Sequence, residues 1–354
     1  MFLIMKSYKH LFEKFISYQN LYLAYKNARK SKPNKKQVLD FGFNLEQNLF
    51  SIQEDIINNK YVVSNYLIFK IFEPKERIIA APTFRDVVIQ HAIINIIEPI
   101  FNKTFICDSF SCRKNKGIHK GLFRIKKTIQ SQNHPKYYLK CDIKKYFPSI
   151  NKNILKKMIS KKIKDSKIIT ILYQIIDSYH SEYGNHKGIP IGNLTSQLFA
   201  NIYLNNLDQF VKHSLKVKPY YRYVDDFILF SNSKKELNFL RFKIKLFLFT
   251  YLDLDMPKNK TYINLVEEGI DFVGYKIFPK KIKLRKINVN RFIKRTKENK
   301  YLYISKKIKK EYISFSISSF LGYCKHANAN NLLNLIFENN FIEYKSLLSK
   351  VCKS

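Results

Sequence analysis

Two adjacent carboxylates, Asp225 and Asp226, interrupt a run of aromatic and β-branched residues between positions 219 and 232. The apolar runs 220–223 and 227–230 predict two short strands, so the two acids fall at the tight turn of a hairpin. Two like charges held this close repel each other unless a cation lies between them. An Asp-Asp pair that only closes a turn would explain this dipeptide by itself, so a second acidic stretch has to decide between the two interpretations.

That second stretch covers residues 137–150, where another apolar strand ends in an acid, Asp142. If this strand pairs with the hairpin, Asp142 lies beside Asp225 and Asp226. Carboxylates are hard oxygen ligands for Mg²⁺, and two such ions about 3.5–4 Å apart can hold the attacking and leaving oxygens of an in-line phosphoryl transfer. The pattern therefore predicts nucleotidyl transfer with two Mg²⁺ ions, for which Mn²⁺ could substitute.

The composition favours a polyanionic partner. Across 354 residues, 64 Lys and Arg stand against 27 Asp and Glu, a formal net charge of +37, and a polynucleotide is the natural counterpart. Codon bias in an AT-rich genome is an alternative source of part of the lysine content. The five cysteines form no metal-binding or disulfide pattern. We expect a cytoplasmic protein with no membrane association, because the sequence has neither a secretory leader nor an apolar run of membrane-spanning length.

The first half of the chain predicts helices followed by a hairpin. Residues 7–30 and 43–58 have helical periodicity and are separated by a break at 31–34; they either pack as an extension or contact nucleic acid. Residues 66–86 predict strand, turn and strand, and a helix follows through position 97. Lys75 and Arg77 on that hairpin could reach a triphosphate, the arginine through a planar fork; otherwise they are solvated turn charges.

A basic loop at residues 109–120 follows, in which Arg113, Lys114 and Lys116 are predicted to contact template-strand phosphates. His119 in this loop has no evident metal partner and is interpreted as an ordinary loop histidine. Residues 151–179 predict one long lysine-rich helix.

The turn Tyr223-Val224-Asp225-Asp226 and the segment 142–147 resemble the catalytic motifs of reverse transcriptases. The resemblance implies that Asp142, Asp225 and Asp226 bind the metal ions, with the backbone of Ile143 close to them. It also implies that Phe147 is a steric gate against a 2′-hydroxyl, that Lys260 protonates the departing pyrophosphate and that Arg77 lies over the incoming nucleotide. Without the resemblance, Phe147 would be a core phenylalanine and Lys260 a surface lysine.

The Gly/Pro loop at residues 188–201 opens onto a helix, which lets the backbone approach a nucleotide closely. Ile191, Gly192 and Gln197 are the predicted nucleotide-binding residues of this loop. It is similar to the loop of diversity-generating retroelement reverse transcriptases, because Ile191 stands where retroviral and group II intron enzymes have Gln, and Gln197 where they have Pro. A lost side-chain hydrogen bond, worth about 0.5–1.5 kcal/mol, implies looser nucleotide selection.

The last third predicts a helix at 234–252, a hairpin at 269–277, a basic helical region at 280–310 and a final helix at 330–349. The hairpin resembles a primer grip, in which Gly274 permits close backbone approach. The basic region would track duplex phosphates through residues such as Lys294 and Arg295. Residues 318–328 resemble a thumb motif.

The resemblance covers nearly the whole chain and implies an α+β right-hand polymerase with fingers, a ferredoxin-like palm and a helical thumb. The predicted boundaries are 1–60 for an N-terminal helical extension, 61–137 for the fingers, 138–279 for the palm with helices in 151–187, and 280–354 for the thumb.

The implied function is low-fidelity copying of a template-repeat RNA into cDNA for diversity-generating retrohoming. Its partners would be template RNA, primer, dNTPs and a small basic helical accessory protein. The alternatives are an abortive-infection type defence enzyme that makes DNA from a non-coding RNA or without template, and a binding module with a dead site. Intact aspartates disfavour the last.

Overall fold

A computed structural model describes residues 7–72, 75–132 and 134–340 of the chain. It divides into two compact units, each assembled from three stretches of sequence. Unit 1 consists of Met1–Asn115, Lys140–Phe227 and Asn238–Tyr262, and unit 2 of Lys116–Leu139, Ile228–Leu237 and Ile263–Ser354. The four domain boundaries expected from the sequence stay predictions.

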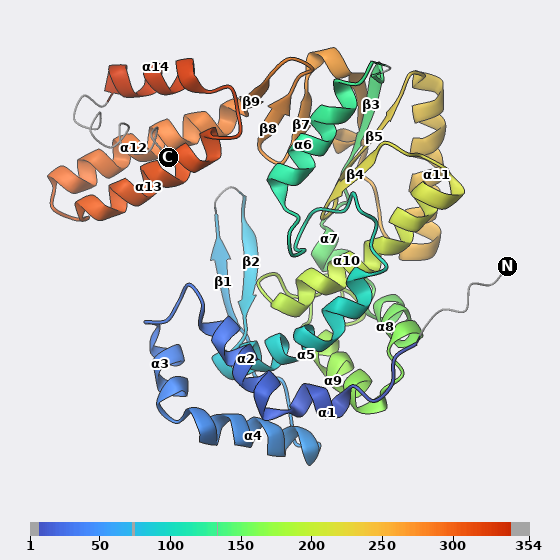
Figure 1. The fold of residues 1–354 in the computed structure, drawn as a ribbon, viewed down its shortest axis with the longest axis vertical. Helices are drawn as coiled ribbons and strands as arrows, with labels where there is room; N and C mark the ends of the chain where they lie inside the picture. Colours follow the sequence, from blue (N-terminus) through green and yellow to red (C-terminus); the bar gives the residue numbers. More distant parts are fainter. Residues whose placement is uncertain (1–6, 73–74, 133, 341–354) are drawn as a thin grey trace. The chain divides into compact units, whose positions relative to one another are not determined.

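The N-terminal part of unit 1 is helical, but the single helix predicted over 7–30 is divided at Ser17, whose side chain caps the second helix by accepting the backbone N–H of Asn20. A helix at 36–43 was not predicted. The helices of this part are α1 Phe12–Ile16, α2 Tyr18–Arg29, α3 Lys36–Phe43, α4 Leu45–Ile57 and α5 Phe84–Asn102 (Figure 1). The long helix α5 is the core of this part, because both of its flanks are apolar and it packs against α2. Thr83 caps its first turn by accepting the backbone N–H of Asp86, and the Asp86 carboxylate in turn accepts the hydroxyl of Tyr61 at 2.9 Å.

The central part of unit 1 contains α7 Tyr146–Ser149, α8 Lys152–Lys162, α9 Ser166–Asp177, α10 Leu194–Gln209 with a π-helical turn Phe210–Ser214, and α11 Lys234–Leu252, most of which belongs to this unit. The single helix predicted over 151–179 is wrong in one respect, since it is broken at Ile163–Asp165. Asp165 ends the continuity because its carboxylate caps α9 through the Ile168 N–H and also accepts the backbone N–H groups of Leu11 and Phe12.

The predicted hairpin at 66–86 is present as β1 Leu67–Ile71 and β2 Arg77–Ala81, which pair antiparallel with Ile71 opposite Arg77. A second sheet has the strand order β4-β5-β3-β6, formed by β3 Tyr137–Cys141, β4 Tyr220–Tyr223, β5 Asp226–Ser231 and β6 Tyr262–Leu265. The strand that ends at Asp142 therefore pairs with the strand that begins at Asp226, as the sequence predicted. Lys258–Lys260 forms a 3-10 turn just before β6.

Unit 2 combines helices with a three-stranded antiparallel sheet. It contains α6 Ile118–Ile129, β7 Ile270–Phe272, β8 Tyr275–Ile277, β9 Ile282–Leu284, α12 Lys286–Ile304, α13 Lys310–Cys324 and α14 Asn330–Asn340. Helices α12 and α13 pack through stacked Phe292 and Phe320 rings 3.7 Å apart. The last predicted helix is observed through 340, and its residues 341–349 lie outside the described part.

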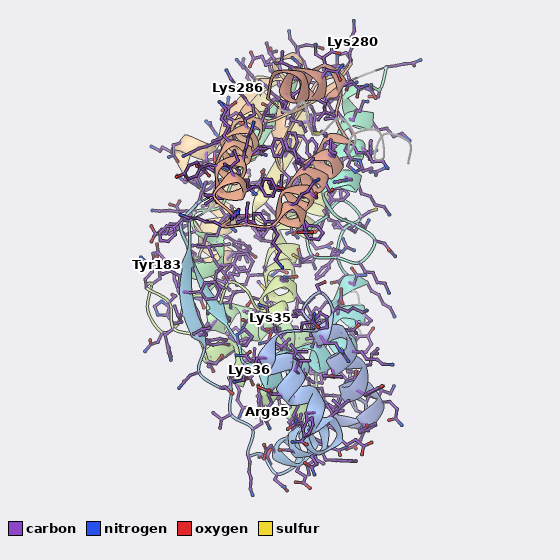
Figure 2. The ribbon with its side chains drawn as sticks, turned by 90° about the vertical axis from the view of Figure 1, so that its left-hand side faces the viewer. Lys35, Lys36, Arg85, Tyr183, Lys280 and Lys286 are labelled. Atoms are coloured by element: carbon purple, nitrogen blue, oxygen red, sulfur yellow. The ribbon has the colours of Figure 1, made fainter. Side chains whose placement is uncertain are left out.

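Lysines stand out on the surface of both units. Figure 2 labels Lys35 and Lys36 where α3 begins in unit 1, and Lys280 and Lys286 on either side of β9 in unit 2. Within the described ranges, no helix combines the length and the apolar character that crossing a membrane requires. The mixed helix-and-sheet class predicted from the sequence is confirmed.

Candidate active site

The β4–β5 hairpin turns through Val224 and Asp225, whereas Asp226, which was also predicted to lie in the turn, is the first residue of β5. Val224 has φ 56°, a left-handed conformation that a β-branched residue adopts only under constraint. The constraint comes from Arg222, whose Nη1 donates a 2.9 Å hydrogen bond to the Val224 carbonyl. The turn that presents Asp225 is therefore held in shape by a side chain of the strand before it.

Arg222 is fully buried and lies in a polar network beneath this turn. Its Nε and Nη2 donate to Oδ1 and Oδ2 of Asp208 at 2.7 and 2.6 Å, a two-pronged ion pair in which both side chains are shielded from water. The Tyr220 hydroxyl donates to the same carboxylate at 2.7 Å, and Asn201 accepts from Nη1 at 3.3 Å. This network joins α10 to β4 and fixes the base of the hairpin.

The surroundings of Asp225 disfavour the ionised form of its carboxyl group. Burial is the largest cause and the negative charge of Asp142 the next, and with a smaller contribution from Asp226 they raise the pKa of Asp225 from 3.8 to about 6. A hydrogen bond from its own backbone N–H and the positive charge of Lys260 act in the opposite direction. Asp142 and Asp225 are thus close enough to influence each other, as the sequence predicted, and a bound cation would relieve their repulsion.

Asp226 is engaged differently from its neighbour. Nζ of Lys140 on β3 lies 2.6 and 2.7 Å from its two carboxylate oxygens, with the lysine side chain only 11% exposed. Successive residues at a strand start point to opposite faces, which explains how adjacent acids come to have different partners. Within the described residues, no three His, Cys, Asp or Glu side chains are grouped tightly enough to hold a metal ion. The predicted site of three carboxylates and two metals stays a prediction.

Lys260 lies beside the acids, as predicted. Its Nζ is 3.1 Å from Oδ1 of Asp142, and both side chains remain partly exposed. An exposed pair of this kind contributes little stability. Proton transfer from Lys260 stays a prediction.

The predicted nucleotide loop contacts the β1–β2 hairpin. The Ile191 carbonyl accepts the backbone N–H of Ala80 at 3.1 Å. Gly192 has φ +114°, and a Cβ there would lie 3.1 Å from Cγ2 of Ile79, so the glycine permits this close approach. Just beyond, the buried oxygens Asn193 Oδ1 and Thr195 Oγ1 find no hydrogen-bond partner within the described part of the chain. A water molecule or a ligand group would have to supply the hydrogen bonds that these two oxygens lack.

The other predicted nucleotide contacts are distributed around unit 1. Phe147 is half-buried in α7 with its ring 5.7 Å from that of Tyr146, while the side chain of Ile143 is buried, which leaves only its backbone for a ligand. The remaining three, Lys75, Arg77 and Gln197, are all exposed. Their predicted contacts to a nucleotide stay predictions.

Arg113 has internal partners that the sequence did not indicate. Its Nε donates to Asn102 at 2.8 Å, and its Nη1 donates to the carbonyls of Ile106 and Ser109 at 2.7 and 2.9 Å. These bonds give the arginine a structural role in closing its loop. Lys114 is exposed and Lys116 half-buried; a template contact remains a prediction for all three.

In unit 2, Gly274 has φ +92° and its carbonyl accepts the Tyr323 hydroxyl, so its space is filled by a side chain of α13. Lys294 and Arg295 are exposed on α12, Lys294 with Glu298 3.9 Å away. His119 is not in a loop, because α6 begins at Ile118. Its ring lies 3.5 Å from that of His326, and burial and this neighbour lower the pKa of His119.

Sequence reasoning overlooked the two basic residues that position the acids, Lys140 and Arg222. A signal was present, since each is a charged residue inside an otherwise apolar strand, and such a residue requires a buried partner. The identity of that partner could not be read, because it lies elsewhere in the chain.

The acidic hairpin, the opposed strand that leads into Asp142 and the lysine beside Asp142 are the elements that the sequence analysis predicted for nucleotidyl transfer. A family model described as "Reverse transcriptase (RNA-dependent DNA polymerase)" matches residues 71–277, more than half of the chain. The chain belongs to the reverse transcriptase family. The matched segment contains Asp142, Asp225, Asp226 and Lys260, and the family assignment agrees with the right-hand polymerase fold predicted from the sequence.

Several proteins are similar to this chain. Protein YkfC of Escherichia coli (strain K12) is 24% identical over 262 residues, covering 62% of this chain and 69% of that protein. The group II intron-encoded protein LtrA of Lactococcus lactis subsp. cremoris is 27% identical over 332 residues, covering 72% of this chain and 54% of that protein. The chain thus spans about half the length of the intron-encoded protein. A solved structure of apo telomerase from Candida tropicalis has a TM-score of 0.49 and 16% identity, covering 66% of this chain and 53% of the other.

Proposed function

We propose that this chain polymerises DNA on an RNA template, with Asp142 and Asp225 at the reacting phosphate. The observation that carries the proposal is the geometry of the acidic strand ends. Strand β3, which leads into Asp142, pairs with β5, which begins at Asp226, and Nζ of Lys260 lies 3.1 Å from Oδ1 of Asp142. Burial and the charge of Asp142 also raise the pKa of Asp225 to about 6, and carboxyl groups perturbed in this way are common at functional sites.

The carboxylate oxygens of Asp142 and Asp225 fit a hard divalent cation such as Mg²⁺, and the mutual repulsion at Asp225 is what such an ion would neutralise. A bound divalent ion would supply charge stabilisation for the developing phosphoryl transition state. Lys140 binds the Asp226 carboxylate, so Asp226 would hold a metal ion only if this ion pair opened. Lys260, adjacent to Asp142, is placed to give a proton to the leaving group.

Primer extension on poly-rA with an oligo-dT primer tests this proposal. We expect Asp225→Asn or Asp142→Asn to reduce extension by about 10²–10³-fold, a size typical for loss of transition-state charge stabilisation, while RNA binding is retained. The matched control is Asp177→Asn, because Asp177 is also paired to a lysine but its side chain, at the last position of α9, is 53% exposed. Extension by Asp225→Asn at the control rate would contradict the assignment.

The finer role that we propose is low-fidelity copying of a template-repeat RNA for a diversity-generating element. Support comes from the nucleotide loop, in which Ile191 is fixed through its carbonyl to Ala80 while its side chain offers no hydrogen-bond partner to a nucleotide. Base selection would then depend on geometry alone. A missing contact of about 0.5–1.5 kcal/mol allows up to about tenfold more misincorporation.

Sequencing the cDNA made on one RNA template tests the role. We expect the wild type to err frequently opposite template adenines and Ile191→Gln to reduce those errors. The control Leu194→Gln, three residues further on at the first position of α10, should leave them unchanged. Uniformly low error in all three proteins would remove the diversity-generating role and favour the defence function, without affecting the polymerase assignment.

The proposed partners are template RNA, a primer strand, dNTPs and a small basic helical accessory protein. The net charge of +37 supports the nucleic-acid partners. Co-purification of the chain with a candidate accessory protein and template RNA, each omitted in turn, tests whether the accessory protein depends on RNA for its association.

A further inference from the structure

Helix α11 has an apolar face that nothing in the described chain covers. Its buried face carries Leu240, Ile244 and Leu248 among others, which anchor the helix in unit 1. On the opposite face of the helix, four large apolar side chains are exposed to solvent. They are Phe239, Phe242, Leu246 and Phe249, with exposed fractions of 55, 62, 50 and 72%, and we call them the α11 stripe.

The stripe follows helical geometry. Its members are separated by three, four and three positions, which places them in one line along the helix. This is the spacing of the a and d positions in a coiled coil, a seam narrower than the apolar face of a helix packed in a globular core. Soluble proteins rarely leave such a contiguous apolar surface without a partner.

Positive charge borders the seam. If Phe239 takes position a, then Lys243 and Lys245 occupy e and g, the positions that choose a partner through charge. Nζ of Lys243 lies 5.4 Å from the centroid of the Phe239 ring, so it is at the seam itself. From 238 to 252 the helix contains Arg241 and these two lysines and no acid.

The positive charges beside the stripe help to decide which kind of partner could bind there. A second copy of this chain would set each lysine against another lysine, which disfavours a dimer through this face. Single-stranded nucleic acid binds through successive aromatic rings, and Leu246 interrupts the series. A membrane surface favours a broad apolar face, whereas here the opposite side of the helix is buried in protein. An amphipathic helix with acidic e and g positions satisfies both the apolar seam and the lysines.

We propose that the α11 stripe is a docking surface for an acidic amphipathic helix of a partner protein. The partner helix would lay leucine-type side chains between the stripe residues and pair Glu or Asp with Lys243 and Lys245. This surface is independent of the proposed polymerase reaction, and the accessory protein proposed above is basic and would not meet it in this way.

Three designed fluorescent peptides of about three heptads test the proposal. Two share one leucine seam, one with Glu and the other with Lys at e and g, and the third is the Glu peptide with its seam scrambled. By fluorescence anisotropy with the full chain, we expect the Glu peptide to bind at least tenfold more tightly than the Lys peptide, and than a Glu peptide of the same composition with its seam scrambled.

Variants of the chain separate the seam from general attraction to a basic protein. Phe242→Ser with Phe249→Ser should weaken binding of the Glu peptide at least tenfold, as expected for loss of central apolar anchors. Phe43→Ser, at an 89% exposed aromatic of α3, should leave it unchanged. Lys243→Glu with Lys245→Glu should reverse the preference toward the Lys peptide.

Equal binding of the Glu peptide by the wild type and the Phe242/Phe249 variant would overturn the proposal. It would also be overturned if light scattering showed a dimer that the same substitutions dissociate, or if those substitutions abolished binding to phosphatidylserine vesicles or to oligo-rU without affecting the peptide. Each of these results would assign the stripe to another occupant.

Discussion

Removing the charge of Asp225 should stabilise the protein. The folded chain raises the pKa of this carboxyl from 3.8 to about 6, mainly through burial and the charge of Asp142. A raised pKa means that the folded state binds the proton more strongly than the unfolded state does. The favourable contribution is therefore complete below about pH 4 and is lost as the pH rises through about 6.

The magnitude follows from the shift. Each pKa unit corresponds to about 1.4 kcal/mol, so a shift of about two units destabilises the ionised folded protein by up to about 3 kcal/mol. At about pH 7.5, Asp225→Asn should raise the free energy of unfolding by up to this amount, and at about pH 4 the difference should disappear.

Urea denaturation of both proteins at the two pH values provides the measurement, because a change in midpoint at constant slope reports stability. Asp177→Asn is the control, since its carboxylate is exposed and paired to Lys156 at the surface. Mg²⁺ at about pH 7.5 should stabilise the wild type and not Asp225→Asn, because only the former has the charge to bind it. A variant no more stable than the wild type at about pH 7.5, or equally stabilised at both pH values, would refute the reasoning.

Three further predictions concern the hairpin and the net charge. Arg222→Met should lower the free energy of unfolding, measured by chemical denaturation, by about 3–5 kcal/mol because it leaves Asp208 buried without its partner. The double variant Arg222→Met/Asp208→Leu should lose less stability than Arg222→Met alone. An equal or larger loss in the double variant would show that Arg222 does not stabilise the fold through this ion pair. Val224→Asn should raise stability by about 1 kcal/mol by easing the left-handed turn; an unchanged thermal midpoint would show that the turn is unstrained. RNA affinity should fall roughly 10³–10⁵-fold between about 50 and 200 mM salt if six to ten phosphates are contacted; a flat filter-binding response would mean that the charge reflects codon bias.

The hairpin and its acids were predictable because their signals are local. The alternation of apolar residues around Asp225 and Asp226 specified two strands and a turn, and the strand before Asp142 was equally clear. The break at Asp165 was missed although the residue is a good helix cap, because helical periodicity continues on both sides of it. Local periodicity predicts that a helix is present, whereas capping residues determine the position at which it ends.

The partners of charged residues were not predictable in the same way. Lys140 meets Asp226 across 86 positions of sequence, a distance over which one sequence carries no pairing signal. With 64 basic residues to choose from, composition cannot say which lysine binds which acid. The same limit applies to His119 and His326, whose contact needs α6 and the end of α13 to be brought together by the fold.

The hairpin β1–β2 has one further consequence. Its sheet has only two strands, with large apolar side chains exposed at Leu67, Ile68 and Phe69, and a two-stranded hairpin is marginally stable alone. The hydrogen bond from Ala80 to Ile191 links it to the nucleotide loop, so the two segments should open and close as one cooperative unit. A ligand that orders the nucleotide loop should therefore also slow amide hydrogen exchange in the β1–β2 hairpin.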